Sequence, residues 1–408
     1  MRTVLHELVE TVEAQWRRAQ YAESAFADIA AEALIKGAPH KNLDIAGELA
    51  DIARGDREQG EFVGSHSASE VIPIFWGARF GVYLHFWYDD IGNPHSHSWS
   101  GAYQVLAGTC VQASFSFEER LTIDPKFKLG ALETTHLGLL SPGTTVRVVR
   151  GPEMIHGLSY VDRPGIAISI RTHEEFGGLT LDYWAPGIAI ETGFLDASTE
   201  RRIKALNTLY AMDPSLCAQA LESALEAADF RTCFYLLRHS MMKFREQVDV
   251  RASYASAEQA FGKNADLVMG ALAEFERDSL LRQRRKEVRD LNQRFLLSAL
   301  HLAPTRSAVH RLVAEHYPGE DPQKFVSRNL LDMSSTPGKG GKTLLGTPDD
   351  RDLSAILGLL LDDDRTESVL ARLEEEFDVT EIREKEALLR EACQGIREQP
   401  ILRPLFAS

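Results

Sequence analysis

The stretch GNPHSHSWSGAYQVLAG, residues 92–108, decides how the rest of the sequence is interpreted. It places His95 and His97 two residues apart, just before a segment rich in β-forming side chains. Successive side chains of a strand point to opposite faces, so residues two apart point to the same face. The two imidazoles therefore lie on one side of the predicted strand, as adjacent ligands of a metal ion must.

On both sides of this stretch, between Val71 and Ile190, the sequence consists of short β-branched and aromatic runs separated by Gly and Pro. The clearest of these runs cover residues 71–76, 80–87, 102–117, 132–140, 144–150 and 166–171. Strands this short and this evenly spaced are typical of an antiparallel sandwich or barrel.

Helical patterns flank the β region on both sides. From Val4 to Ile35 apolar residues recur at steps of three and four, and a second helix is predicted from Leu43 to Ile52. Residues 54–69 are rich in Gly and charge and are predicted to form a loop. From about Ser198 the helical pattern continues to the end of the chain. We therefore expect an α+β protein with N-terminal helices (1–69), a β-barrel domain (70–195) and a large all-α domain (196–408).

Composition limits the classes of partner. The 408 residues include 44% hydrophobic and 26% charged residues, which is typical of a globular protein. Asp and Glu exceed Lys and Arg by 60 to 45, and the net charge of −15 argues against a nucleic acid or an anionic membrane as partner. No apolar run approaches the roughly 20 residues that a membrane span needs. The N-terminus is acidic and amphipathic, so we expect a cytoplasmic protein.

The cysteines are scattered along the chain and form no C-x-x-C pair, which argues against a disulfide framework or a Cys-rich zinc site. They are Cys110, Cys217, Cys233 and Cys393. The first of them, Cys110, is predicted to be a small buried side chain.

With its histidine pair on a strand and a further histidine, His156, 59 residues later, the β region resembles the cupin superfamily. The residues that match the two cupin signatures in order are His95, His97, Gly108, Gly143, Pro152 and His156. The resemblance covers roughly residues 70–175 and implies a cupin-like barrel with a metal site.

One departure narrows the resemblance. Gly101 stands where many cupins carry a metal-binding glutamate, and loss of this glutamate is a feature of the thiol dioxygenases, the branch that includes cysteine dioxygenase. The run FGVYLHFW (80–87) is similar to the strand that precedes the histidine pair in that branch. Ala102, however, stands where the animal enzymes have a crosslinked cysteine.

This resemblance implies that His95, His97 and His156 bind Fe(II) and leave one face of the ion open for substrate and O₂. Three neutral ligands suit an incoming anion such as a thiolate, since the anion compensates the charge of the ion. The expected activity is that of a non-haem iron oxygenase, a dioxygenase-like oxidoreductase acting on a small anionic thiol or amino-acid-type substrate.

Four further residues are candidates for contacts with substrate or oxygen. Arg171 and His173 alternate on the run IAISIRTH. If they face the interior, Arg171 can hold an anion and His173 can shuttle a proton; the alternative is that both cap the strand end at the surface. Tyr103 shares the histidine face by the period of two, where Gly101 would leave room for a bulky ligand. Tyr160, four residues after the third histidine, is a second candidate to line the site.

Other interpretations remain open from the sequence. Zn, Ni or Mn in the same site would give a hydrolase, isomerase or decarboxylase. A barrel without catalytic function could bind a ligand while the helical half docks a protein. The helical half (198–408) resembles no known family, and it could cover the barrel mouth, form a homodimer interface or bind a partner.

Three features are predicted to have no role in chemistry. His85 and His136 are expected to be core or surface histidines. The basic run Arg282–Lys286 alternates with acidic residues and is predicted to form a solvated helix face.

Overall fold

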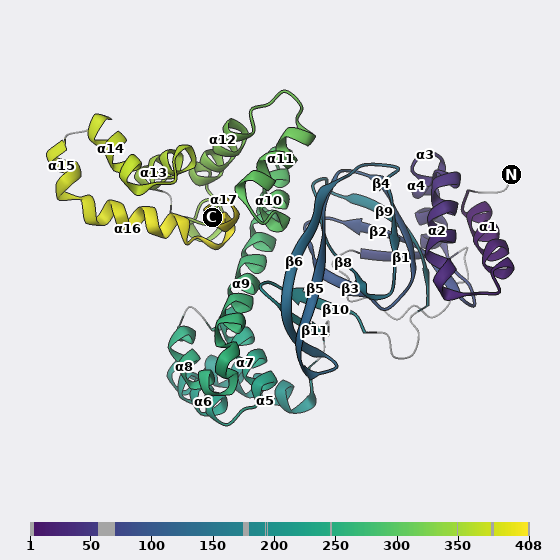
Figure 1. Cartoon of the computed structure of the whole chain (residues 1–408), viewed down its shortest axis with the longest axis horizontal. Coiled ribbons are helices and arrows are strands. Elements are labelled where there is room, and N and C mark those ends of the chain that lie inside the picture. Colours follow the sequence, from purple (N-terminus) through teal and green to yellow (C-terminus); the bar gives the residue numbers. More distant parts are fainter. Residues whose placement is uncertain are drawn as a thin grey trace.

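The computed structural model describes residues 4–55, 70–173, 179–191, 193, 195–244, 247–348, 350–376 and 379–406. The β region lies between the N-terminal helices and the helical half (Figure 1). Most of the predicted loop, residues 56–69, falls outside the described residues.

The strands run from Glu70 to Glu191. They are β1 (Glu70–Trp76), β2 (Phe80–Trp87), β3 (Gly92–His97), β4 (Gly101–Ala107), β5 (Cys110–Asp124), β6 (Phe127–Leu140), β7 (Thr145–Val148), β8 (Gly151–Tyr160), β9 (Gly165–Thr172), β10 (Leu181–Trp184) and β11 (Ile188–Glu191). Five of them form a sheet in the order β1-β2-β9-β4-β7, and the other six close into a barrel in the order β10-β11-β6-β5-β8-β3. The predicted antiparallel β-barrel core, preceded by helices and followed by a large helical half, is confirmed.

The N-terminal helices are α1 (Val4–Arg18), α2 (Glu23–Gly37), α3 (Pro39–Asn42) and α4 (Ile45–Arg54). The helical half contains α5 (Ala197–Met212), α6 (Pro214–Glu226), α7 (Phe230–Lys243), α8 (Val250–Phe261), α9 (Ala265–Glu287), α10 (Leu291–Leu302), α11 (Arg306–His316), α12 (Pro322–Ser335), α13 (Arg351–Asp362), α14 (Thr366–Glu376), α15 (Val379–Glu384), α16 (Glu386–Arg397) and α17 (Arg403–Phe406). Across the part of the chain that the structure describes, no helix combines the length and the apolar character needed to cross a bilayer.

Two predicted elements are each split in two. The single run 102–117 divides into β4 and β5 at Gly108, whose φ of 82° is a conformation that glycine adopts without strain. The N-terminal helical run divides between α1 and α2, where Gln20 and Tyr21 have positive φ angles. Both breaks are turns inside a continuous apolar pattern, and the pattern alone does not reveal them.

The two sheets face each other across a buried apolar cluster, here called the inter-sheet core. Its buried members are Trp87, Trp99, Tyr103, Val105, Cys110, Leu140, Val148, Leu158, Tyr160 and Ala167. The opposite face of the five-stranded sheet packs against the N-terminal helices, for example through Phe26 of α2 and Phe80 of β2. Because strand side chains alternate, one set of residues fills the inter-sheet core and the other anchors the helices.

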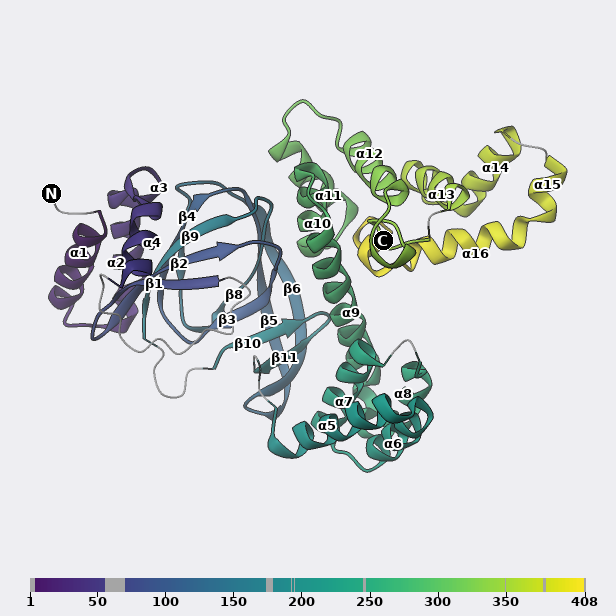
Figure 2. The same ribbon diagram turned by 180° about the vertical axis from the view of Figure 1, so that it is seen from behind.

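The helical half packs against the outer surface of the barrel sheet. Helix α10 lies against β8, where Gly157 approaches Leu302 so closely that an added Cβ would stand 2.8 Å from its Cδ2 atom. Figure 2 shows α9 and α10 running alongside the barrel, with α5–α8 at one end and α12–α16 projecting away. The helices nearest the barrel therefore touch the strands that carry the histidines.

The prediction that the basic run Arg282–Lys286 forms a solvated helix face is wrong. Arg284 and Arg285 are 4% and 1% exposed, so this part of α9 is not a solvated face. The guanidinium of Arg285 donates to the Tyr160 carbonyl, to the Asp89 carbonyl at 3.2 Å and to Ser298 Oγ at 2.6 Å. Burial is tolerated because these acceptors replace the water that the arginine loses.

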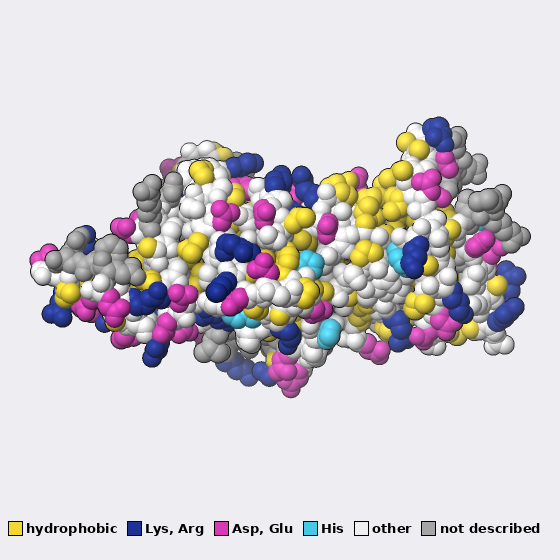
Figure 3. Space-filling view, turned by 90° about the horizontal axis from the view of Figure 1, so that it is seen from above, with side chains coloured by type: hydrophobic (Ala, Val, Ile, Leu, Met, Phe, Trp, Pro, Cys, Tyr) yellow, Lys and Arg dark blue, Asp and Glu magenta, His cyan; other side chains and the backbone are white. Residues whose placement is uncertain are grey.

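Charges are interspersed on the surface. On the face drawn in Figure 3, Lys, Arg, Asp and Glu side chains are mixed and not gathered in one patch of a single sign.

Candidate metal centre

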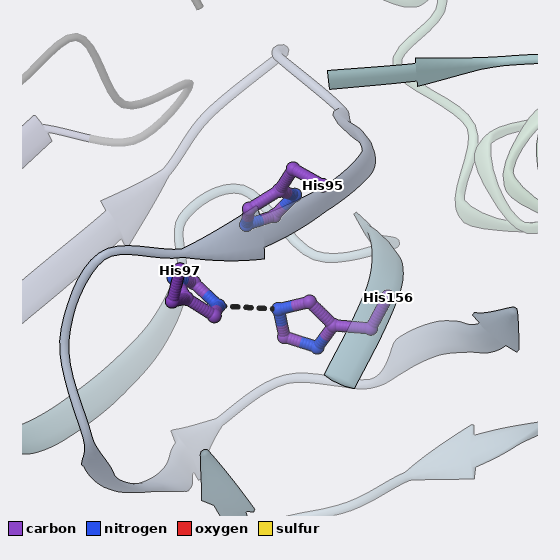
Figure 4. A group of neighbouring side chains, drawn as sticks. All are labelled: His95, His97 and His156. Atoms are coloured by element: carbon purple, nitrogen blue, oxygen red, sulfur yellow. Dashed lines mark hydrogen bonds between the residues drawn. The ribbon is translucent and has the colours of Figure 1, made fainter. Parts of the chain in front are cut away.

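Strands β3 and β8 are neighbours in the barrel sheet, and their pairing brings the three predicted histidines together. His95 lies opposite His156 in the register, and His97 follows on the same strand. One ring nitrogen from each lies within 4.8 Å of the others, and His97 Nε2 is 2.9 Å from His156 Nε2. Figure 4 shows the three rings turned toward a common point from these two strands.

The protonation of these rings suits a metal ion. Burial holds the pKa of His97 and of His156 well below the ordinary value, and each also feels the neighbouring histidine His95. Both are therefore neutral at pH 7, with a lone pair available. Two nitrogens bound at about 2.1 Å and at a right angle to one ion lie about 3.0 Å apart, close to the observed spacing. Within the described residues this group includes no carboxylate.

His156 is 1% exposed, whereas His95 and His97 are partly exposed. The group thus has a buried side and a side that solutes can reach. The Nδ1 atom of His156 is buried without a hydrogen-bond partner, which leaves the orientation of that ring to its packing and to whatever its Nε2 atom binds.

The orientation of His95 follows from a bulge in β3. Gly92 pairs with Leu158 and His95 with His156, so β3 contains one residue more than β8 between these two pairs. Pro94, which has no N–H to donate to the ladder, lies inside the bulge. The carbonyl of Asn93 accepts a hydrogen bond from His95 Nδ1 at 2.7 Å. A carbonyl can only accept, so Nδ1 carries the proton and Nε2 keeps its lone pair for an ion.

Arg171 lies beside the histidines, on the wall formed by the five-stranded sheet. Its guanidinium lies 3.9 Å from the ring centroid of Tyr83 and 5.5 Å from that of Trp99. Trp99 in turn packs on His97, with 4.4 Å between ring centroids. The positive charge of Arg171 contributes to lowering the pKa of His97. Arg171 is thus placed to meet a negatively charged group near the histidines, while its role remains a prediction.

His173 is placed differently. Its ring stacks on Trp76 at 4.2 Å, and its Nε2 atom donates to the Gly77 carbonyl at 2.7 Å. This position is at the end of β1, and the contacts that lead from it toward the three-histidine group pass through Trp76, Tyr83, Arg171 and Trp99. A direct proton transfer by His173 at that group is not what this geometry favours.

Both candidate tyrosines lie in the inter-sheet core. Tyr103 lies with its ring centroid 5.8 Å from that of His156, and its hydroxyl donates to Gln112 Oε1. Tyr160 stacks on Trp87, and its buried hydroxyl has no hydrogen-bond partner. Burial raises the pKa of both phenols well above the ordinary value, so both are protonated at neutral pH. They can donate hydrogen bonds but do not act readily as bases.

Gly101 does not open space for a ligand, contrary to the expectation from its sequence position. A Cβ added there would lie 2.0 Å from the carbonyl oxygen of Ile170 and 2.9 Å from the Cα atom of Arg171. Glycine is required because β4 and β9 approach each other closely at this point. A side chain at this position would be directed at the backbone of β9.

His85 and Ser169 lie on the same wall as Arg171. His85 Nε2 is 2.8 Å from Ser169 Oγ, and burial, helped by the charge of Arg171, lowers the pKa of His85 to about 3. His85 is half-buried and hydrogen-bonded to Ser169, in agreement with the predicted core or surface histidine. His136 is exposed, as expected of a surface histidine, and Cys110 is fully buried, as predicted. The position of His85 near Arg171 could have been found from the alternation of β2, where it shares a face with Tyr83.

Comparison with known proteins adds little to this geometry. No family model matches the sequence, and no curated protein matches it. Among solved structures, the DMSP lyase DddQ from Ruegeria pomeroyi DSS-3 is 18% identical over 32% of this chain and 64% of its own, with a TM-score of 0.21. A structure titled for the DMSP lyases RdDddP and RnDddQII is 13% identical over 43% of this chain and 96% of its own, with a TM-score of 0.23. A recombinant oxalate oxidase in complex with glycolate is 12% identical over 40% of this chain and 77% of its own, with a TM-score of 0.20.

The match thus spans less than two thirds of DddQ. TM-scores near 0.2 support no argument about activity, so the case for a metal site rests on the three histidines themselves.

Proposed function

We propose that this chain is a non-haem Fe(II)-dependent oxygenase that acts on a small anionic thiol or amino-acid-type substrate with O₂. One observation carries the proposal: three neutral imidazoles converge without a carboxylate, and an arginine lies beside them. Fe(II) held by His95, His97 and His156 would supply open coordination positions and one-electron chemistry with O₂. The sequence resemblance to the thiol dioxygenases supports the finer assignment, and the absence of a carboxylate from the described three-histidine group agrees with it.

The protein's own side chains account for the preference for an anion. Three neutral ligands leave the charge of a divalent ion uncompensated, which favours a negatively charged partner. The guanidinium of Arg171 adds a second positive charge on the opposing wall, and it is preorganised by its contacts with Tyr83 and Trp99. A carboxylate bound there would leave the other end of a small molecule facing the histidines.

The inter-sheet core accounts for the small size of the substrate. Leu158 and Tyr160 follow His156 on the same face of β8, Trp87 stacks on Tyr160, and all three are under 8% exposed. A substrate therefore has to approach from the side on which His95 and His97 are partly exposed. The protonated hydroxyl of Tyr160, which has no hydrogen-bond partner, is a neutral donor in this core, whereas that of Tyr103 already donates to Gln112.

The test compares iron content and oxygen uptake in three proteins, each expressed with iron and purified without oxygen. Wild type and His136→Ala, a matched control on an exposed strand position, should hold about one iron per chain, and His97→Ala should lose it. Iron-loaded wild type should consume O₂ with at least one member of a panel of small thiols and amino acids.

Three results would contradict the proposal. Zinc, nickel or manganese bound at the histidines after iron loading would favour hydrolysis, isomerisation or decarboxylation. Iron bound at the site without substrate-dependent O₂ uptake would leave a metal centre that is not an oxygenase, and no metal at all would favour a ligand-binding barrel.

A further inference from the structure

Helix α9, which belongs to the helical half, reaches the strand that carries two of the three histidines. Arg282 of this helix donates through Nη2 to the side-chain oxygen of Asn93 on β3. The two residues are 189 positions apart in the chain, so this contact exists only because the helical half packs on the barrel. Asn93 is also the residue whose backbone carbonyl accepts the hydrogen bond from His95.

We propose that Arg282 is a positioning residue for the metal centre, acting on His95 through Asn93. The inference rests on the part of the proposed function in which His95 binds a metal ion, and it does not depend on oxygenase activity. It assigns to the helical half a role as a structural part of the site.

The bulge in β3 frees the backbone of Asn93. Because the pairing with β8 is interrupted between Gly92 and His95, the Asn93 peptide is released from the regular ladder. Its carbonyl is free to turn toward the ring of His95, and nothing in the ladder holds it there. A hydrogen bond to the side chain of the same residue restricts the rotation of the whole residue, and with it the direction of its carbonyl.

Arg282 is itself held in place. Its Nε atom donates to Asp278 Oδ2 at 2.7 Å, one turn earlier on α9, and Nη1 lies 3.8 Å from Asp90 Oδ1. Asp278, 8% exposed at its side chain, lies 3.4 Å from His301 Nε2 on α10. The guanidinium is therefore oriented by two helices before it reaches Asn93. Planar, multi-donor geometry of this kind is specific to arginine and is not reproduced by lysine.

The orientation of the His95 ring depends on its hydrogen bond to the Asn93 carbonyl. Among the residues that the structure describes, it is the one member of the triad whose ring nitrogen away from the other two histidines bonds to a protein acceptor. Groups that orient a ligand histidine in this way typically contribute about 10–100-fold to metal affinity. Arg282 does not contact His95 itself but acts on it through Asn93. We therefore expect removal of Arg282 to weaken metal binding about tenfold, the lower end of that range.

The test uses Co²⁺ as a probe, since its visible absorption reports both binding and ligand geometry. Cobalt chloride is titrated into the metal-free full-length chain under argon, for wild type, Arg282→Met, Asn93→Ala and the double variant. Arg289→Met is the matched control, because Arg289 lies just after α9, is 56% exposed and bonds to Asp89 and not to β3. Near-native tryptophan fluorescence is required of each variant.

We expect Arg282→Met and Asn93→Ala each to raise the Kd for Co²⁺ about tenfold and to change the Co²⁺ absorption band. The double variant should be no weaker than the weaker single one, because both act through the same hydrogen bond. Arg282→Lys should restore only part of the affinity, and Arg289→Met should bind as wild type.

The failures of the two proposals are distinguishable. If His95→Ala binds Co²⁺ as tightly as wild type, the metal site itself is wrong. If His95→Ala loses Co²⁺ while Arg282→Met and Asn93→Ala bind it with wild-type affinity and spectrum, the metal site stands and the positioning role is refuted. Should Arg282→Met fail to fold, Asn93→Ala alone decides between these outcomes.

Discussion

Replacement of Gly101 by alanine should destabilise the barrel by an amount that the structure allows us to estimate. The added Cβ would lie 2.0 Å from the Ile170 carbonyl oxygen, so β4 and β9 must separate by at least 1.0 Å to reach a tolerable 3.0 Å. Overpacking of a well-packed region typically costs about 1–3 kcal/mol. The separation also weakens ladder hydrogen bonds between Gly101 and Arg171, at about 1 kcal/mol each. We therefore expect a loss of about 3 kcal/mol.

Urea unfolding followed by tryptophan fluorescence is the appropriate assay. The five tryptophans all lie at or before Trp184, so their emission reports the N-terminal helices, the barrel and, through Trp184 packed on Phe275, the contact of the barrel with α9. With an m-value of about 2–3 kcal/mol/M, the midpoint should fall by about 1 M. Gly138→Ala is the control: its Cβ would meet only the exposed ring of His136 at 3.1 Å, so its effect should stay within about 0.5 kcal/mol.

A Gly101→Ala protein as stable as Gly138→Ala would refute the close approach of β4 to β9. The same reasoning predicts that Gly101→Glu does not create a fourth metal ligand. Its side chain would start toward β9, so a gain in metal affinity would contradict the geometry in the same way.

Further predictions follow from the charged residues. Burial lowers the pKa of His85 to about 3, against about 6.5 in the unfolded chain. Below pH 6.5 the unfolded state therefore binds a proton at this ring that the folded state does not bind. Stability is thus lost toward low pH at up to about 1.4 kcal/mol per pH unit from this group, and His85→Gln should show a shallower loss between pH 6 and 4 in urea titrations. Asp89→Asn removes the negative charge 3.1 Å from the guanidinium of Arg294, and since Arg294 is 1% exposed we expect the free energy of unfolding to fall by about 3 kcal/mol. Asp51→Asn, which breaks an exposed ion pair, should change it by less than about 1 kcal/mol. Arg171→Met should raise the KM for an anionic substrate about tenfold or more with little change in metal content, and an unchanged KM would contradict the proposed anion contact.

The local patterns predicted the architecture and the three histidines, because alternation, helical periodicity and the His-x-His spacing are local properties. The strand β3 itself is poorly marked: GNPHSH contains no β-branched residue, and its extended form is held by β8 and β10 and not by propensity. Gly101 was interpreted as space for a ligand because the sequence does not show that β9 passes behind it.

The burial of Arg285 and Arg294 cannot be predicted from local sequence patterns. The basic run on α9 has the composition of a solvated face, yet Arg285 donates to the carbonyl of Tyr160, 125 residues earlier. Arg294 donates to the carbonyl of Tyr88, 206 residues earlier. Such acceptors are available only after the helical half has packed on the barrel, so no window of neighbouring residues contains the information.

The two arginines with proposed roles approach the three-histidine group from different elements of the fold. Arg171 belongs to β9 of the five-stranded sheet and faces the inter-sheet core, whereas Arg282 belongs to α9 and reaches β3 through Asn93. Arg171 would select the substrate, and Arg282 would help to hold the metal ion. The two arginines share no contact, so the effect of Arg171→Met on KM and the effect of Arg282→Met on Co²⁺ affinity should combine in the double variant with a coupling below about 0.5 kcal/mol. A larger coupling would show that holding the ion and selecting the anion are a single property of one connected site.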